Sequence, residues 1–284
     1  MNIIGQERLL STINHLVADD NFPRYSIICG CTGSGKKLIS AYIAKQLDAL
    51  FVPCELGIDA VRDVIKTSYE QMSPIVYMWA DSQKMSIGAK NAILKVTEEP
   101  PQNAYFIMTT DNTNWLLGTL LSRGTVFNIN PYTKDELNTF ATLKIPNISK
   151  DNLDILTDIS NVPQDILDLS KIDITKFNNV VKIICDNIGK SNIANELKIT
   201  NMLKLKDKDE EGENEKFDPI LFLRACMFRY SELLKQTLNP VYSNLITITS
   251  KYLADLYSKS LNKIATVDTW ILDMHTIAER SVDK

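Results

Sequence analysis

The stretch that decides the fold reads SIICGCTGSGKKL and runs from Ser26 to Leu38. The apolar run from Tyr25 to Cys29 predicts a buried strand, and the apolar residues after Lys36 recur at helical spacing. A glycine-rich turn between a strand and a helix is typical of a phosphate-binding loop. Backbone N–H groups, the positive end of the helix and the Lys36 ammonium would then surround an anion.

The residue after this lysine departs from the pattern of a working nucleotide hydrolase. That position needs Ser or Thr, whose hydroxyl ligates Mg²⁺, but Lys37 has donors and no acceptor. Two unit charges about 4 Å apart at an effective dielectric near 20 interact by about 4 kcal/mol, and a divalent ion doubles this repulsion. We therefore expect ATP or ADP to bind weakly or without hydrolysis, and Mg²⁺ is doubtful. The residues predicted to hold phosphate are Gly30, Cys31, Thr32, Gly33, Ser34, Gly35, Lys36 and Lys37.

Composition points to a globular protein of two or three domains. The chain has 284 residues, 44% of them hydrophobic and 23% charged, with a net charge of −4. This charge argues against broad, nonspecific affinity for nucleic acid. The sequence lacks both a membrane-length apolar run and a signal-peptide pattern. The five cysteines are scattered, so we expect free thiols in a reducing cytoplasm and predict no metal ligands.

The first part of the chain alternates strands with helices. Apolar runs predict further strands at residues 51–54, 75–79, 104–109 and 125–129, and helical patterns lie at 58–69, 86–99 and 114–122. This alternation predicts an α/β domain, a parallel sheet with helices on both faces. Ligands of such sheets bind at the carboxyl ends of the strands, where the glycine-rich loop already lies.

From Tyr132 onward only helical patterns remain. Helices are predicted at residues 133–141, 150–159, 162–169, 174–188, 193–205, 217–238, 241–261 and 265–281. Residues 206–216 read KDKDEEGENEK, a charge run that predicts a solvated loop or a disordered insert. We expect three domains, at residues 1–131, 132–172 and 173–284, with the charged insert 206–216 in the last.

Three stretches together carry a family resemblance. They are IIGQ from Ile3 to Gln6, the glycine-rich loop, and KMSIGAKNAILKVTEEPPQNAYFIMTTDNTNWLLGTLLSRG from Lys84 to Gly124. In these stretches the chain resembles the clamp-loader branch of the AAA+ ATPases, in particular the delta-prime type subunit of DNA polymerase III and its phage relatives. The resemblance implies an N-terminal AAA+ domain, a small helical lid at 132–172 and an all-helical collar at 173–284 that oligomerises.

The resemblance also gives roles to single positions. A pair of acids after the strand at 75–79 would hold Mg²⁺ and activate water, but the pair here is Ala80 and Asp81. Asp81 is not a simple replacement for the first acid, because successive strand residues face opposite ways. Thr110 matches a nucleotide-sensing position, and Gln164 stands where the family has an arginine that reports on the γ-phosphate.

Arg123, in contrast, matches the family completely. In the family this arginine is a finger that reaches the nucleotide of the neighbouring subunit, and such a residue is worth about 10³–10⁵ in rate. The plainer interpretation of Arg123 is a surface salt bridge. Lys84, Lys90 and Lys95 either form an ordinary solvated helix face or contact DNA phosphates.

These patterns favour an accessory, non-hydrolysing subunit of a clamp loader. The implied partners are AAA+ clamp-loader ATPase subunits in a hetero-oligomer, expected to be a pentamer, together with a sliding clamp and primer–template DNA, and no membrane. Its place would be the cytoplasm of a bacterial cell or a phage-infected host. Two alternatives stay open: an active ATPase that recruits Asp81 for Mg²⁺, and a nucleotide-sensing AAA+ adaptor unrelated to clamps.

Overall fold

The computed structural model describes residues 3–146, 148–188, 218–258 and 262–282. It divides into two compact units, Met1–Glu136 with Val162–Gln164, and Leu137–Asn161 with Asp165–Lys284. The helix predicted at 193–205 and the charged insert at 206–216 lie outside the described residues.

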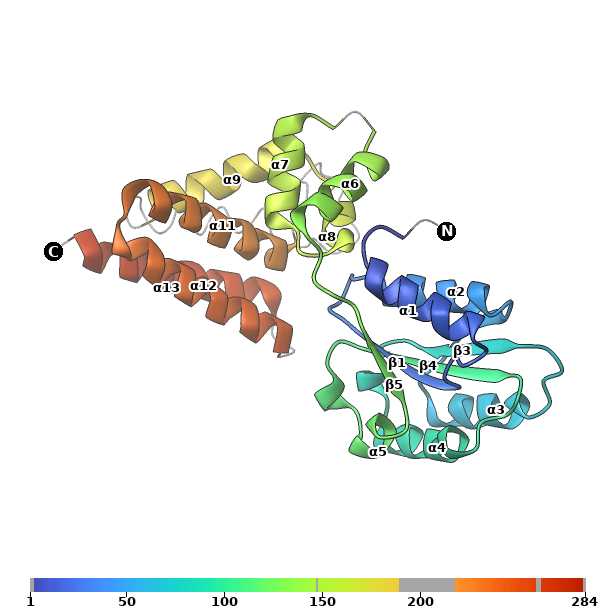
Figure 1. The fold of residues 1–284 in the computed structure, drawn as a ribbon. Helices are drawn as coiled ribbons and strands as arrows, with labels where there is room; N and C mark the ends of the chain where they lie inside the picture. Colours follow the sequence, from blue (N-terminus) through green and yellow to red (C-terminus); the bar gives the residue numbers. More distant parts are fainter. Residues whose placement is uncertain (1–2, 147, 189–217, 259–261, 283–284) are drawn as a thin grey trace, which may run out of the picture. The chain divides into compact units, whose positions relative to one another are not determined.

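A parallel sheet forms the centre of the first unit (Figure 1). Its strands lie in the order β2-β3-β4-β1-β5 and are bounded as follows: β1 Tyr25–Cys29, β2 Leu50–Cys54, β3 Ile75–Trp79, β4 Ala104–Thr110 and β5 Thr125–Asn128. Cys29 lies opposite both Thr110 and Asn128, so these strands end at the same rim. We call this rim the carboxyl end of the sheet and the opposite rim its amino end.

Helices cover both faces of the sheet, which confirms the predicted α/β architecture. α1 (Glu7–Ala18) and α2 (Lys36–Gln46) lie on one face, and α3 (Ile58–Ser68), α4 (Ile87–Glu98) and the short α5 (Gly118–Leu121) lie on the other (Figure 1). Successive strand residues serve the two faces in turn: Ile27 joins the core under α3 and α4, and Ile28 joins the core under α1 and α2.

The single helix predicted at residues 114–122 is wrong. The chain instead forms a 3₁₀ turn, η2 (Thr113–Trp115), followed by α5. Leu116 between them is extended and buried against the core of the sheet, so burial of this side chain interrupts the helix.

Two sets of hydrogen bonds hold segments near the carboxyl end of the sheet in place. The Ser86 hydroxyl accepts from the N–H of Ala89 at 3.1 Å and thereby caps α4, as predicted. The buried amide of Gln6 bonds both backbone groups of Asn130, donating to the oxygen at 2.8 Å and accepting from the nitrogen at 2.9 Å. This pair ties the N-terminal segment to the chain just beyond β5.

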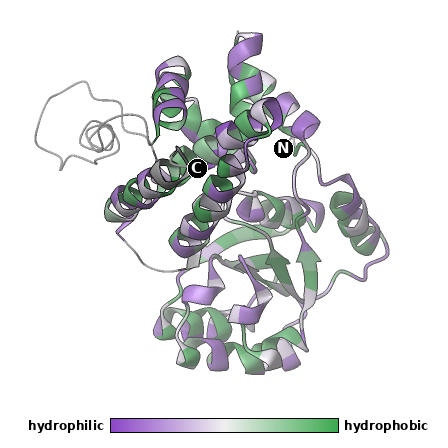
Figure 2. Cartoon of the chain, turned by 90° about the vertical axis from the view of Figure 1, so that its left-hand side faces the viewer, coloured by the Kyte–Doolittle hydropathy of each residue, from purple (hydrophilic) through white to green (hydrophobic). Residues whose placement is uncertain are grey.

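The rest of the described chain is helical, as predicted. The helices are α6 Lys134–Lys144, α7 Lys150–Ile159, α8 Pro163–Leu169, α9 Ile174–Asn187, α11 Pro219–Thr237, α12 Pro240–Ser258 and α13 Lys263–Val282. They carry both hydrophilic and hydrophobic residues along their length (Figure 2), and apolar residues of α7, α8, α9, α11, α12 and α13 form a shared core. None of the helices in the described ranges has the length and apolar character that crossing a membrane requires.

A buried ion pair links the helices of the second unit. Arg224 on α11 donates to the Asp165 carboxylate on α8 at 2.8 Å and to the carbonyl oxygen of Ile159 at the end of α7 at 2.5 Å. This contact helps to explain why residues 137–161 group with the C-terminal helices in a single unit. The predicted division into a lid at 132–172 and a collar at 173–284 stays a prediction.

Candidate functional site

The glycine-rich loop leaves β1 at the carboxyl end of the sheet and leads into α2. Gly33 and Gly35 have φ angles of +81° and +92°, in the left-handed region that favours glycine. At Gly33 space is limiting as well, because a Cβ atom there would lie 2.6 Å from the Cβ of Gln164, in the segment that groups with the first unit. The loop therefore has the backbone geometry that the sequence predicts.

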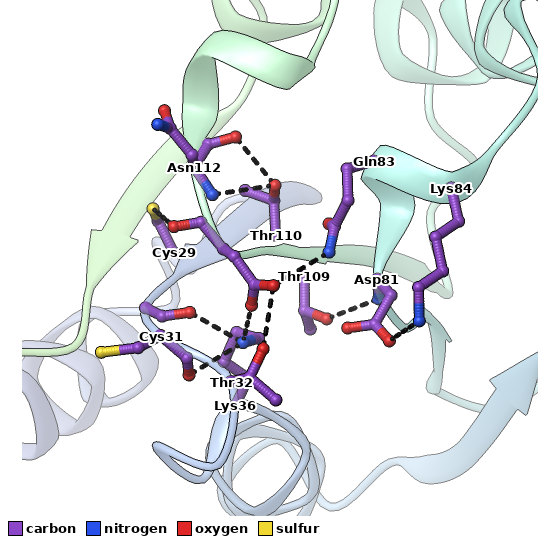
Figure 3. A network of polar contacts seen from close by, with 12 residues as sticks. Cys29, Cys31, Thr32, Lys36, Asp81, Gln83, Lys84, Thr109, Thr110 and Asn112 are labelled. Atoms are coloured by element: carbon purple, nitrogen blue, oxygen red, sulfur yellow. Dashed lines mark hydrogen bonds and ion pairs between the residues drawn. The ribbon is translucent and has the colours of Figure 1, made fainter. Parts of the chain in front are cut away.

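The Lys36 ammonium donates hydrogen bonds to three acceptors of its own chain (Figure 3). Its Nζ donates to the carbonyl oxygens of Gly30 at 2.7 Å and Cys31 at 3.1 Å, and it pairs with Oδ1 of Asp111 at 2.6 Å. An ammonium has three donors, so these three acceptors satisfy it.

Asp111 is the residue that sequence reasoning missed. Its second oxygen, Oδ2, accepts from the Thr32 hydroxyl at 3.0 Å and from the Gln83 amide at 3.2 Å. One carboxylate thus joins the loops that follow β1, β3 and β4. The available signal was an acid directly after a strand that neighbours the glycine-rich loop in the sheet.

Thr110, the residue predicted to sense nucleotide, is buried, and its hydroxyl bonds to the backbone two residues further along the chain. Its hydroxyl donates to the carbonyl oxygen of Asn112 at 2.9 Å and accepts from the Asn112 N–H at 3.3 Å (Figure 3). These bonds stabilise the turn after β4. The neighbouring Asp111, one residue later, points its side chain to Lys36 instead.

The positions that would hold Mg²⁺ do not fit the ion. Lys37 and Ala80 are exposed and offer no oxygen ligand. Asp81 has a left-handed backbone, φ +51°, and its carboxylate pairs with Lys84 at 2.8 Å, apart from Lys36 (Figure 3). Mg²⁺ demands oxygen ligands in near-octahedral geometry, and the described residues contain no cluster of three or more His, Cys, Asp or Glu that could hold a metal.

The two cysteines on either side of Gly30 differ in their surroundings. Burial raises the pKa of the Cys29 thiol, whose Sγ lies 3.8 Å from the backbone oxygen of Asp111. Cys29 is therefore a protonated thiol at neutral pH, while Cys31 is exposed on the loop. Tyr132 also contacts the loop, because its hydroxyl donates to the carbonyl oxygen of Ser34 at 2.9 Å.

Arg123 lies at the other end of the sheet. It lies two residues before β5, which runs parallel to β1 with Ser26 opposite Thr125 and Cys29 opposite Asn128. Four residues of strand span about 13 Å, so the backbone of Arg123 is separated from the glycine-rich loop of its own chain by about this length. Its guanidinium donates to the Thr119 carbonyl oxygen at 2.7 Å and to the Glu98 carboxylate at 2.6 Å.

Lys90 is neither on a solvated helix face nor free to contact DNA, so both predicted interpretations are wrong for this residue. It is 8% exposed, and its Nζ donates to the carbonyl oxygen of Trp115 at 3.0 Å and weakly to that of Gln83 at 3.5 Å. It joins the segments after β3 and β4. Lys95 is exposed, and Lys84 is held by Asp81.

Comparisons with known proteins find relatives that are named as subunits of DNA polymerase III and of replication factor C. The family model described as DNA polymerase III, delta subunit, matches residues 56–133. The chain is 23% identical to DNA polymerase III subunit tau of Bacillus subtilis over 48% of this chain and 30% of that protein. It is 34% identical to subunit delta' of Haemophilus influenzae over 26% and 24%, and 24% identical to the replication factor C small subunit of Haloarcula marismortui over 55% and 53%.

The chain thus matches between about a quarter and about half of the length of these relatives. They confirm the predicted resemblance to the clamp-loader branch of the AAA+ ATPases, a class that implies nucleotide binding in general. A phage origin stays a prediction.

Solved structures support the fold. A DNA polymerase III gamma subunit-related protein of Thermotoga maritima superposes with a TM-score of 0.54 at 16% identity, covering 95% of this chain and 99% of that one. The RuvB branch migration motor of the same organism gives 0.53 at 15% identity, covering 82% of each chain. At these identities the likeness concerns the fold alone.

Proposed function

We propose, on the premise that the chain is related to the clamp-loader branch of the AAA+ ATPases, that it is an accessory subunit of a DNA polymerase clamp loader. It does not hydrolyse nucleotide itself, and it supplies Arg123 to the nucleotide of a neighbouring ATPase subunit. The observation that carries this proposal is the placement of the two cations at opposite ends of one sheet, Lys36 at the carboxyl end and Arg123 at the amino end.

The chemistry of the chain's own loop argues against hydrolysis. Phosphoryl transfer depends on positioning and on charge neutralisation, in which Mg²⁺ is central. Lys37 and Ala80 remove both expected protein contacts to the metal, and Asp81 already neutralises Lys84. The alternative of an active ATPase requires Asp81 to leave Lys84 and turn toward the loop.

The setting of Arg123 suits a residue that acts on another chain. Its side chain is 33% exposed, and that of its partner Glu98 is 53% exposed. Exposed ion pairs contribute about 0–1 kcal/mol, so a polyphosphate can replace Glu98 at small cost. Since Arg123 is far from its own loop, the phosphate has to come from a neighbouring subunit.

Assembly follows from this arrangement. The relatives are named as subunits of DNA polymerase III, so AAA+ clamp-loader subunits are the partners we propose, in a hetero-oligomer of five chains. Residues 132–172 would act as the lid and 173–284 as the oligomerising collar. The complex would open a sliding clamp at primer–template DNA in the cytoplasm.

Steady-state ATP turnover by the purified chain tests the proposal. We expect no turnover above background with Mg²⁺. The Ala80→Asp and Lys37→Thr double variant restores the missing metal ligands and serves as the matched control for a gain of activity. Turnover by the unchanged chain that Ala80→Asp alters little, and that Asp81→Asn abolishes, would instead establish the active ATPase.

A further inference from the structure

The Asp111 carboxylate contacts Lys36 where an anionic ligand of the loop would be expected to bind. Its Oδ1 lies 2.6 Å from the Lys36 ammonium, whose side chain is 9% exposed. We propose that Asp111 is an internal counter-ion that determines what the loop accepts, and that it competes with the phosphates of ATP and ADP for Lys36. This inference rests on the proposed function, because a subunit that does not turn nucleotide over has no need of a free Lys36.

The contacts of Lys36 support competition rather than sharing. Its remaining donors go to the carbonyl oxygens of Gly30 and Cys31. A phosphate oxygen that approaches the ammonium must therefore displace Asp111 or one of these carbonyls. If Asp111 stays in place, its negative charge repels the phosphates at close range.

Asp111 is held in this position from two further sides. Its Oδ2 accepts from Thr32, within the loop itself, and from Gln83, which follows β3. Its backbone directly follows β4, and the Gly30 N–H donates to the Thr110 carbonyl oxygen at 3.1 Å. Both the side chain and the backbone of this segment are thus held against the loop.

A different role for Asp111 would be to replace the missing acid at Ala80 as a ligand of Mg²⁺. The geometry favours the counter-ion, because one oxygen is bound to a cation and the other accepts two hydrogen bonds. The two roles predict opposite effects of removing the charge. Loss of a counter-ion tightens nucleotide binding, and loss of a metal ligand weakens Mg²⁺-dependent binding.

Isothermal titration calorimetry on the full chain separates them, with ATP, ADP and inorganic tripolyphosphate as probes, each with and without Mg²⁺. Asp111→Asn keeps the size of the side chain and removes its charge. We expect all three probes to bind this variant about tenfold more tightly than the unchanged chain, with or without Mg²⁺, since hydrogen bonds to charged groups have this magnitude. Asp59→Asn on α3 matches the change in net charge away from the loop, and we expect its affinities to stay within about twofold.

A second variant removes the cation as well. In Asp111→Asn combined with Lys36→Ala, the gain in affinity should disappear, because the gain is assigned to the release of Lys36. Asp111→Ser repeats the test with a smaller side chain, and circular dichroism verifies folding of each variant.

The proposal is overturned if Asp111→Asn binds the probes no more tightly than the unchanged chain, if it loses Mg²⁺-dependent binding, or if Asp59→Asn gives the same gain. Failure of both Asp111 variants to fold would also overturn it, since the pair would then hold the fold rather than control the loop. ATP turnover by the unchanged chain would contradict the proposed function, whereas these binding measurements address Asp111 alone.

Discussion

The two ends of the sheet carry ion pairs of the same length in opposite settings. At the carboxyl end Lys36 and Asp111 lie 2.6 Å apart, with side chains 9% and 24% exposed. At the amino end Arg123 and Glu98 also lie 2.6 Å apart, but with side chains 33% and 53% exposed. The Lys36–Asp111 pair, which we call the inner pair, is largely shielded from water and is supported by four further hydrogen bonds. The Arg123–Glu98 pair, the outer pair, faces solvent.

This difference in exposure indicates which of the two cations, Lys36 or Arg123, is available to a partner. Breaking a buried pair leaves an uncompensated charge in a poorly solvated place, so the pair persists. An exposed pair exchanges its carboxylate for water or for another anion at little cost. The Lys36–Asp111 and Arg123–Glu98 pairs have the same length, so distance does not distinguish them. The exposure of their side chains does.

The largest effect is expected at the inner pair. Lys36→Ala leaves Asp111 without its cation, and it removes the donor to two loop carbonyls, so we expect about 2 kcal/mol of destabilisation. Hydrogen exchange of peptides from β1 and β4 measures the free energy of opening. Lys37→Ala, one residue away and exposed, is the control and should change it by less than about 0.5 kcal/mol. Equal effects of Lys36→Ala and Lys37→Ala would show that the Lys36–Asp111 pair does not stabilise this end of the sheet.

A smaller effect is expected at Lys90, which supports the carboxyl end from α4. Lys90→Ala removes the bond to the Trp115 carbonyl oxygen, and we expect a loss of about 1 kcal/mol in the free energy of unfolding. Urea denaturation followed by circular dichroism measures it. Lys95→Ala on the same helix is exposed and should be neutral; a loss as large as that of Lys90→Ala would mean that helix effects, not the buried contact, are responsible.

The outer pair should matter least for stability. Arg123→Ala in the isolated chain is expected to change the free energy of unfolding by about 0.5 kcal/mol or less, and Glu98→Gln should do the same. Thermal denaturation at low and high salt provides the measurement. A cost comparable to that of Lys36→Ala would show that the pair is structural and would weaken the case for a residue reserved for a partner.

The smallest expected effect concerns how fast the thiols of Cys29 and Cys31 are alkylated. Because burial raises the pKa of Cys29, less thiolate is present at a given pH, and its alkylation should be slower than that of the exposed Cys31. Iodoacetamide labelling at pH 8 with peptide mass spectrometry gives the order. Faster labelling of Cys29 would mean that the loop opens in solution, and the inner pair would then be less secure than its geometry indicates.

Much of this arrangement can be predicted from the sequence. The strands at Tyr25–Cys29 and Ile75–Trp79 have their predicted bounds, because continuous apolar runs between turn residues are strong signals. The glycine-rich loop and the departures at Lys37 and Ala80 can also be recognised from the sequence alone, since motif positions are local.

The partners of the charged side chains could not be predicted. Thr110 and Asp111 are neighbours, and which of them faces Lys36 depends on how the chain turns after β4. Lys90 resembled a surface lysine because the sequence pattern of its helix is only partly amphipathic. Its two acceptors are backbone oxygens of other segments, which the pattern of the helix does not reveal. Such contacts are set by tertiary packing, about which sequence spacing carries no information.

The most direct test uses the complex in which the chain would work. The tagged chain is co-purified from its native cells with its AAA+ partner, and the DNA-stimulated ATP turnover of the complex is measured for the unchanged chain, Lys36→Ala and Arg123→Ala. We expect Arg123→Ala to reduce turnover about 10³-fold or more at the neighbouring site that this residue completes while assembly is retained, and Lys36→Ala to leave the turnover of the complex within about twofold. Turnover that collapses with Lys36→Ala and persists with Arg123→Ala would contradict the account.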